Sequence, residues 1–257
     1  MPYTNYGEIM KIGDYVVRKK YKKDILFEIV DIHNDMYILR GVELRLIADS
    51  EEDDLELSDV QPYEHDTFSI ARQPMLRGKV LHLDGDEKYL KMCRHKYNEL
   101  KIRADCYYMK ESEMKTRVRG LLEKHKPQIL VITGHDALRK DHDKTDIHNY
   151  QHSLDFVEAI RQARIYEDDK DALIIIAGAC QSYYEMLLAT GANFASSPKR
   201  INIHALDPVY VASLIANESV KNYVDVEDVI NRTSHQQKGI GGIDTKGVAR
   251  KIYPTKG

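Results

Sequence analysis

The sequence predicts an α/β protein in which helices cover both faces of a parallel sheet, with a small β domain in front of it. Strand-like and helix-like segments alternate beyond Gly78, as expected when single helices connect parallel strands. Two short apolar runs, 129–133 and 173–176, are too short for amphipathic helices and are typical of buried strands. The small β domain is predicted by short β-branched or aromatic segments that Gly, Asn or Asp separates.

Composition narrows the class of protein. The chain has 257 residues, 42% of them hydrophobic and 31% charged, with a net charge of -3, so we expect a globular protein with no nucleic-acid partner. No apolar run approaches the roughly 18 residues of a membrane helix, and the amino terminus lacks a signal-peptide pattern. Three scattered cysteines without a CxxC motif favour a reducing compartment over a disulfide framework or a zinc cage. We expect no membrane contact, cofactor or bound metal.

The first 60 residues are expected to form a compact SH3-like barrel. Its predicted strands cover residues 15–18, 25–31, 36–39 and 42–47. We interpret the basic run 18–23 as lysines that protect a sheet edge, and the acidic run 51–54 as an exposed loop. Residues 61–77, with Pro62 and Pro74 and no sustained period, are interpreted as a linker.

Residues 78–257 are predicted to form the α/β domain. The expected strands are 79–84, 104–109, 128–133, 173–176 and 201–206. Apolar spacing predicts helices around 90–100, 114–122, 154–163 and 181–190, and a further helix that Asp207-Pro208 begins. The tail beyond Gly239 is glycine-rich and shows no clear element.

Two chemically reactive residues follow neighbouring predicted strands. His135 comes shortly after the run 129–133, and Cys180 shortly after the run 173–176. Since ligands and chemistry gather at the carboxyl ends of parallel strands, we expect the imidazole and the thiol to face one another. A helix beginning at Gln181 would also direct amide hydrogens at the sulfur. This pair suffices for nucleophilic catalysis.

Two other interpretations of these residues stay open. A free cysteine is often only a buried core residue, and Cys180 could be one. We interpret Cys93, on a helix face, and Cys106, within a strand, in this way. A metal-dependent hydrolase is the other alternative, because histidines crowd the stretch after the run 129–133. They are His135, His142, His148 and His152, although their spacing matches no established zinc pattern.

Three stretches together resemble the YabG family of sporulation-specific proteases, in the clan of caspases, legumains, gingipains and clostripain. They are KIGDYVVRKKY at 11–21, VITGHDA at 131–137 and IIIAGACQS at 174–182. The resemblance covers essentially the whole chain. It implies a caspase-like three-layer domain and a cysteine endopeptidase with Cys180 and His135 as its dyad. It also implies cleavage after arginine of spore coat and germination proteins, in the cytoplasm of the sporulating cell and at the spore coat.

The resemblance leaves the remaining site residues to be assigned. The clan's usual His-Gly is here His135-Asp136, with Gly134 before the histidine. We expect the amide of Cys180 to form the oxyanion hole with an amide at Gly134 or Asp136. Asp136 is also the candidate orienting residue. Asp207, at the end of the predicted strand 201–206, is the candidate S1 carboxylate for arginine.

Asp207 could instead be only a helix cap, and Asp136, Asp141 and Asp143 are the next candidates for the S1 carboxylate. An arginine-specific protease could also cut itself in the linker at Arg72 or Arg77. A non-catalytic spore coat assembly protein, whose barrel binds partners, is the rival from outside enzymes.

Overall fold

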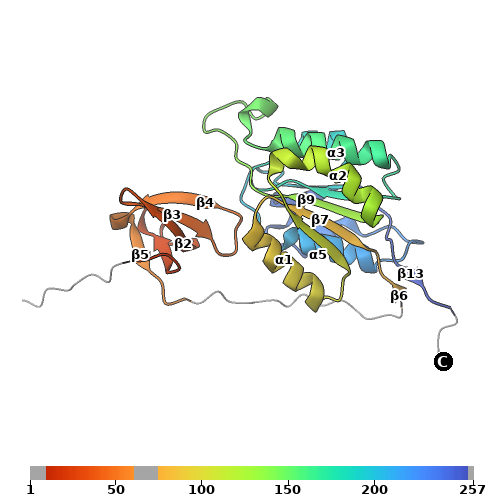
Figure 1. Cartoon of the computed structure of the whole chain (residues 1–257), viewed down its shortest axis with the longest axis horizontal. Coiled ribbons are helices and arrows are strands. Elements are labelled where there is room, and N and C mark those ends of the chain that lie inside the picture. The colour runs from red at the N-terminus through yellow and green to blue at the C-terminus, as the bar shows by residue number, and fades with distance from the viewer. Residues whose placement is uncertain (1–9, 61–74, 254–257) are drawn as a thin grey trace, which may run out of the picture. The chain divides into compact units, whose positions relative to one another are not determined.

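The computed structural model describes residues 10–60 and 75–253. The chain divides into two compact units, Met1–Asp66 and Thr67–Gly257, which are described separately (Figure 1). The expected mixture of strands and connecting helices is confirmed. Most of the predicted linker 61–77, including Arg72, lies outside the described residues. Arg77 is described, and its guanidinium donates to the carbonyls of Leu100 and Lys101.

The first unit is a five-stranded antiparallel sheet with the order β4-β3-β2-β1-β5. Its strands are β1 (Tyr15–Arg18), β2 (Leu26–His33), β3 (Met36–Gly41), β4 (Ile47–Glu51) and β5 (Leu55–Leu57). Asn34 and Asp35 both have positive φ and form the two-residue turn between β2 and β3, as a type I′ hairpin requires. Val16, Phe27 and Leu39 belong to its buried core.

Two expectations for this unit are corrected. Residues 42–46 are a connection rather than a strand, since the amide of Gly41 bonds the carbonyl of Leu46 and closes a turn before β4. The acidic run is not a free loop. It forms a 3-10 helix, Glu52–Asp54, that pairs with the basic run: Arg18 contacts Asp54 at 3.2 Å, and Lys19 Nζ donates to the carbonyl of Asp53. An ion pair and a hydrogen bond therefore join the basic run to the acidic run.

The second unit contains a six-stranded sheet with the order β12-β11-β10-β9-β7-β8. The strands are β7 (Val80–Asp84), β8 (Ala104–Tyr108), β9 (Ile129–Thr133), β10 (Ile174–Ala177), β11 (Phe194–Ser196) and β12 (Ile240–Gly242). All neighbours are parallel except β12, which runs antiparallel to β11. A separate antiparallel pair joins β6 (Met75–Leu76) to β13 (Arg250–Lys251).

Helices cover both faces of this sheet, as expected (Figure 1). One core contains side chains of α2 (Glu111–His125), α3 (Ser153–Tyr166) and α4 (Tyr184–Thr190). The other core contains side chains of α1 (Glu87–Glu99), α5 (Asp207–Asn217) and α6 (Val226–Asn231). Successive residues of β9 alternate between the two cores, with Leu130 in the first and Val131 in the second, because side chains point to opposite faces along a strand. Among the described residues, no helix combines the length and apolar character needed to cross a bilayer.

The structure corrects three expected elements in the second half of the chain. Residues 201–206 are not the fifth strand; β11 (Phe194–Ser196) takes that place beside β10. The helix expected over 181–190 begins only at Tyr184. The glycine-rich tail contributes the edge strand β12, where a Cβ on Gly241 or Gly242 would collide with Tyr184 or Phe194. Small residues therefore let this last strand approach the sheet.

Candidate active site

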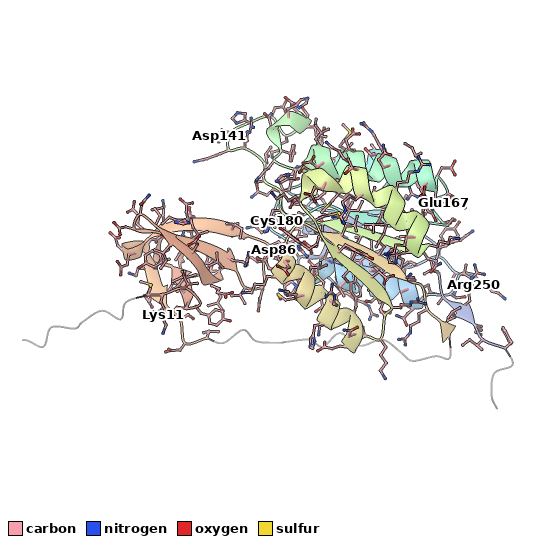
Figure 2. The ribbon with its side chains drawn as sticks, viewed as in Figure 1. Lys11, Asp86, Asp141, Glu167, Cys180 and Arg250 are labelled. Atoms are coloured by element: carbon pink, nitrogen blue, oxygen red, sulfur yellow. The ribbon has the colours of Figure 1, made fainter. Side chains whose placement is uncertain are left out.

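The site lies at the carboxyl ends of three adjacent strands. β7, β9 and β10 are neighbours in the sheet, and Asp86, His135 and Cys180 follow them within three residues. Figure 2 shows Cys180 and Asp86 on the same side of the second unit. The expectation that the histidine and the cysteine follow adjacent parallel strands is confirmed, and it brings in a carboxylate that the sequence interpretation missed.

Asp86 holds the ring of His135. The Nε2 atom of His135 lies 3.0 Å from the Oδ2 atom of Asp86, and the ring of Tyr89 lies at a tilt beside it, with centroids 5.9 Å apart. A carboxylate on Nε2 favours a proton on that nitrogen and leaves the lone pair on Nδ1. The imidazole side chain is 25% exposed, whereas the Asp86 side chain is 5% exposed. His135 is therefore oriented from its buried side and open on the other.

Asp86 is itself held in place by backbone groups. It is the N-cap of α1, where its Oδ1 atom accepts hydrogen bonds from the amides of Lys88 and Tyr89. Its own amide donates to Oδ1 of Asp84 at 2.9 Å. An aspartate before a helix is an ordinary cap, so no sequence signal distinguishes this residue from others. Its second oxygen, which the cap does not use, is the one that reaches His135.

Cys180 is buried in a short non-helical turn. Its Sγ atom accepts a hydrogen bond from the amide of Ile203 at 3.3 Å, and the residue is only 3% exposed. Gln181 follows with a φ of 54°, and its amide donates to Ile201 and Ser197. The expected contribution of a helix N-terminus to the thiol is wrong, because α4 starts only at Tyr184. An amide from the segment 201–203 supplies the N–H to sulfur instead.

Asp136 does not orient His135; it ties the surrounding loops together. Its Oδ1 atom accepts the amides of Ala137 and His152, and its Oδ2 atom accepts the hydroxyls of Ser153 at 2.5 Å and Ser182 at 2.9 Å. Burial raises the pKa of this carboxyl, and the four hydrogen bonds oppose that rise. The expectation that Asp136 orients the histidine is corrected, since Asp86 occupies that position.

The two candidates for the second oxyanion amide differ in their surroundings. The amide of His135 itself donates to Oε1 of Glu111 at 2.8 Å. A Cβ added to Gly134 would collide with the Glu111 carboxylate, so this glycine makes room for that contact. Neither the amide of Gly134 nor that of Asp136 makes a hydrogen bond with any residue that the structure describes.

Asp207 begins α5 and is buried, 1% exposed. Its Oδ1 atom accepts both the amide and the hydroxyl of Ser234 at 3.0 Å. Its Oδ2 atom is buried and has no partner among the described residues. Burial raises its pKa, against the effects of Ser234, His204 and His235. The carboxylate makes no capping bond to α5 among the described residues, since Oδ1 bonds Ser234 alone and Oδ2 bonds nothing, and the strand that it was expected to end is absent.

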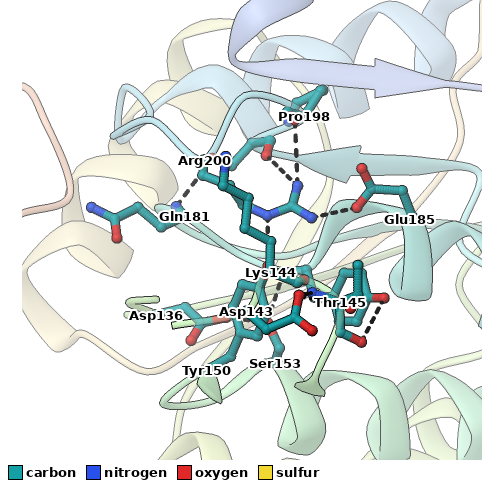
Figure 3. Close-up of polar contacts among 12 residues, drawn as sticks. Asp136, Asp143, Lys144, Thr145, Tyr150, Ser153, Gln181, Glu185, Pro198 and Arg200 are labelled. Carbon is teal, nitrogen blue, oxygen red and sulfur yellow. Dashed lines mark hydrogen bonds and ion pairs between the residues drawn. The ribbon is translucent and has the colours of Figure 1, made fainter. Parts of the chain in front are cut away.

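The loop after His135 is clamped against the loops that follow β10 and β11 (Figure 3). The rings of Tyr150 and Tyr183 stack with centroids 5.1 Å apart, and the guanidinium of Arg200 lies over both rings. The two tyrosine hydroxyls donate to the carbonyls of Lys144 and Thr145. Asp141 and Asp143, the remaining candidates for S1, lie exposed in this loop.

The histidine-rich loop does not form a metal site in the described part of the chain. His142 bonds the carbonyl of Lys140, and His152 bonds Asp155. The one described group of three suitable ligand atoms lies elsewhere, in the buried trio His82, Asp84 and Cys93, with atoms within 4.8 Å of one another. His82 Nδ1 there contacts the hydroxyl of Tyr97 at 3.2 Å.

Sequence comparisons identify the family of the chain. A model of the YabG peptidase U57 family matches residues 11–76 and 69–254. The sporulation-specific protease YabG of Bacillus subtilis (strain 168) is 40% identical over 286 aligned positions, which cover 96% of this chain and 98% of that protein. No solved structure matches the chain. A peptidase of sporulation is thus the class of protein that the matches support. The chain belongs to the YabG peptidase family.

Proposed function

We propose that the chain is a cysteine endopeptidase with a caspase-like catalytic domain. The observation that carries the proposal is the placement of Cys180 and His135 after adjacent parallel strands, with Asp86 holding the far nitrogen of the imidazole. This leaves the Nδ1 atom to receive the thiol proton. Helices on both faces of the sheet support the caspase-like architecture, and the five antiparallel strands of the first unit support the SH3-like barrel.

In the proposed reaction, the Cys180 thiolate attacks the scissile carbonyl. His135 takes the thiol proton at Nδ1 and returns it to the leaving amine, while Asp86 stabilises the imidazolium as a positioning residue. The amides of Cys180 and Asp136 bind the oxyanion, each contributing on the order of 3 kcal/mol. Gly134 is the weaker candidate donor, because its close approach to the Glu111 carboxylate already explains why this residue is a glycine. Water then hydrolyses the thioester.

Asp207 is proposed to recognise arginine at P1. One of its oxygens is held by Ser234, and the other is buried without a partner in the described structure. A guanidinium would supply that missing partner and offset the cost of burying the carboxylate. The segment before it passes the sulfur, since Ile203 bonds Cys180. The proposed substrates are spore coat and germination proteins, processed in the cytoplasm of the sporulating cell and at the spore coat.

The test is cleavage of an arginyl peptide and of a spore coat protein by the purified chain. We expect Cys180→Ala and His135→Ala to lose roughly four to six orders of magnitude in kcat, and the double variant to be scarcely worse, because the residues act as a unit. Cys93→Ser is the matched control and should stay active. Circular dichroism establishes that each variant is folded.

Two reagents separate the rival functions. An alkylating reagent alone should abolish cleavage if Cys180 is the nucleophile. A chelator alone should do so if the protein is a metal-dependent hydrolase. Absence of cleavage by the folded parent would favour a non-catalytic coat assembly protein. Substantial turnover by folded Cys180→Ala would end the cysteine-protease proposal.

A further inference from the structure

A basic cleft opens at the edge of the sheet opposite to the active site. It lies at the amino ends of β7, β8 and β9 and has a volume of about 670 Å³. Six basic side chains line it, namely Arg77, Lys79, Lys101, Arg103, His125 and Lys126, and no carboxylate does so among the described residues. Met75, Leu76 and Ile252 add apolar wall. The cleft is therefore strongly and one-sidedly charged.

The cations of this cleft fall into two groups. The first group is held in the wall. Lys79 contacts Asp105 at 2.8 Å, His125 contacts the same carboxylate at 2.9 Å, and Arg77 donates to the carbonyls of Leu100 and Lys101. In contrast, Lys101, Arg103 and Lys126 are exposed and make no ion pair with any residue that the structure describes. The second group is available to bind a ligand.

Helix ends account for only part of this charge. Lys101 and Lys126 follow α1 and α2, where a cation interacts favourably with the helix dipole. Arg103 precedes β8, so no helix dipole accounts for a cation at this position. A larger cleft beside β13 provides a comparison, because it mixes Glu218 and Asp228 with its basic residues. The excess of positive charge is thus a property of the basic cleft itself.

We propose that the basic cleft is an exosite that binds an acidic segment of the protein substrate. The proposal rests on the endopeptidase function proposed above. Three unpaired cations complement a run of carboxylates, and the apolar wall of Met75, Leu76 and Ile252 suits the side chains of a peptide. A nucleic acid fits less well, since its backbone needs a longer basic track and the chain as a whole is negative.

The position of the cleft fixes where the acidic segment lies in the substrate. The strands between the two edges have five residues in β7 and β9, which corresponds to about 17 Å at roughly 3.3 Å per residue. An extended substrate needs at least about five residues to cover that distance. The acidic segment is therefore well separated from the scissile bond, and a short peptide reaches only the active site.

The first test measures binding without turnover. The probe is a fluorescein-labelled peptide of six glutamates, titrated with the full chain at low and high salt. The triple variant Lys101→Gln, Arg103→Gln and Lys126→Gln should raise its Kd roughly threefold to a hundredfold, and high salt should do the same to the parent. The matched control removes three paired, exposed helix cations, Lys91→Gln, Arg117→Gln and Arg119→Gln, and should bind like the parent.

The second test measures cleavage of two substrates. A short arginyl peptide should be cleaved equally by the parent and the triple variant, whereas a longer peptide with an acidic run ten residues from its arginine should be cleaved more slowly by the variant. Equal binding of the glutamate peptide by all three proteins would overturn the proposal. So would a duplex DNA probe that binds the parent more tightly than the peptide does. Neither result would affect the cysteine-protease assignment, because cleavage of the short peptide tests that separately.

Discussion

The two edges of the central sheet differ in the sign and in the burial of their charged side chains. All the buried carboxylates of the described residues lie at the carboxyl edge. Asp84 is the last residue of β7, and Asp207 begins α5. The others, Asp86, Glu111 and Asp136, follow β7, β8 and β9 within three residues. At the amino edge, the cations around Lys101 and Arg103 are exposed. Burying a carboxylate costs stability unless hydrogen bonds replace its water. The carboxyl edge buries carboxylates despite this loss of stability, and the same edge contains His135 and Cys180.

The partners of the buried carboxylates make the comparison sharper. Asp136 and Glu111 are satisfied by amides and hydroxyls rather than by lysine or arginine. Such donors are fixed by the backbone, so they hold loops in place. In the first unit, by contrast, the ion pair of Lys23 with Glu56 is exposed on both sides and contributes little to stability. The buried carboxylates Asp136 and Glu111 therefore fix the loops around His135.

The largest effect after loss of the dyad is expected at Asp207. If its unpaired oxygen binds the P1 guanidinium, Asp207→Asn should lower kcat/KM for arginyl substrates by roughly a hundredfold to several thousandfold, with little change for neutral peptides. Because burial raises the pKa of Asp207, the preference of the parent for arginine should fall as the pH drops through that pKa. The measurement is the ratio of kcat/KM for matched arginyl and neutral peptides against pH. An unchanged ratio in Asp207→Asn means that another residue forms S1.

Asp86→Asn is expected to lower kcat by about 10- to 100-fold, because the neutral amide no longer stabilises the imidazolium. Asparagine caps a helix as well as aspartate does, so thermal stability should change little. The pH profile of kcat/KM should also change, because the imidazole loses the carboxylate that its Nε2 atom contacts. The check is a pH profile of kcat/KM beside a melting curve. A variant that loses stability but keeps the parental profile would show that Asp86 acts only as a cap.

Asp136→Asn tests the hydrogen bonds that tie the loops together. It should lower the free energy of unfolding by about 2 kcal/mol, because the hydroxyls of Ser153 and Ser182 lose the Oδ2 acceptor, which the NH2 group of asparagine cannot replace. Since the folded pKa of Asp136 is raised, its stabilising contribution is complete below its unfolded pKa and decreases as the pH rises through the folded value. The difference between parent and variant should therefore shrink from about pH 4 toward neutrality. Urea unfolding across that range measures it, and a difference that grows with pH would contradict the sign.

The smallest effect is expected at Cys106. Burial raises the pKa of its thiol to about 11, so almost no thiolate forms near neutral pH. Cys106→Ser should leave kcat/KM within about twofold of the parent, since only a thiolate is a competent nucleophile. Mass spectrometry after brief alkylation should find the label on Cys180 and not on Cys106. Labelling of Cys106 first would reassign the reactive thiol.

Local sequence patterns predicted much of the fold. The strands that end near Asp84, Thr133 and Ala177 were expected within a residue or two, because short apolar runs bounded by helix-forming segments have few other ways to be buried. The helices α1, α2 and α3 followed from their apolar spacing in the same way. So did the positions of His135 and Cys180, which depend only on where two strands end.

Long-range contacts determined the remaining strands and the residues that orient the site. No local sequence pattern specifies such contacts. Residues 201–206 alternate like a strand, yet Ile201 and Ile203 bond the turn around Cys180. The three-residue strand β11 pairs with β10 instead. Asp86 has the sequence context of an ordinary helix cap. His135 reaches its second oxygen only because β9 pairs with β7 in the folded sheet. The sequence by itself determined which residues could be reactive and which strands carry them. The tertiary structure decided which groups orient them, because a hydrogen bond across 49 positions of chain depends on the packing of the whole sheet.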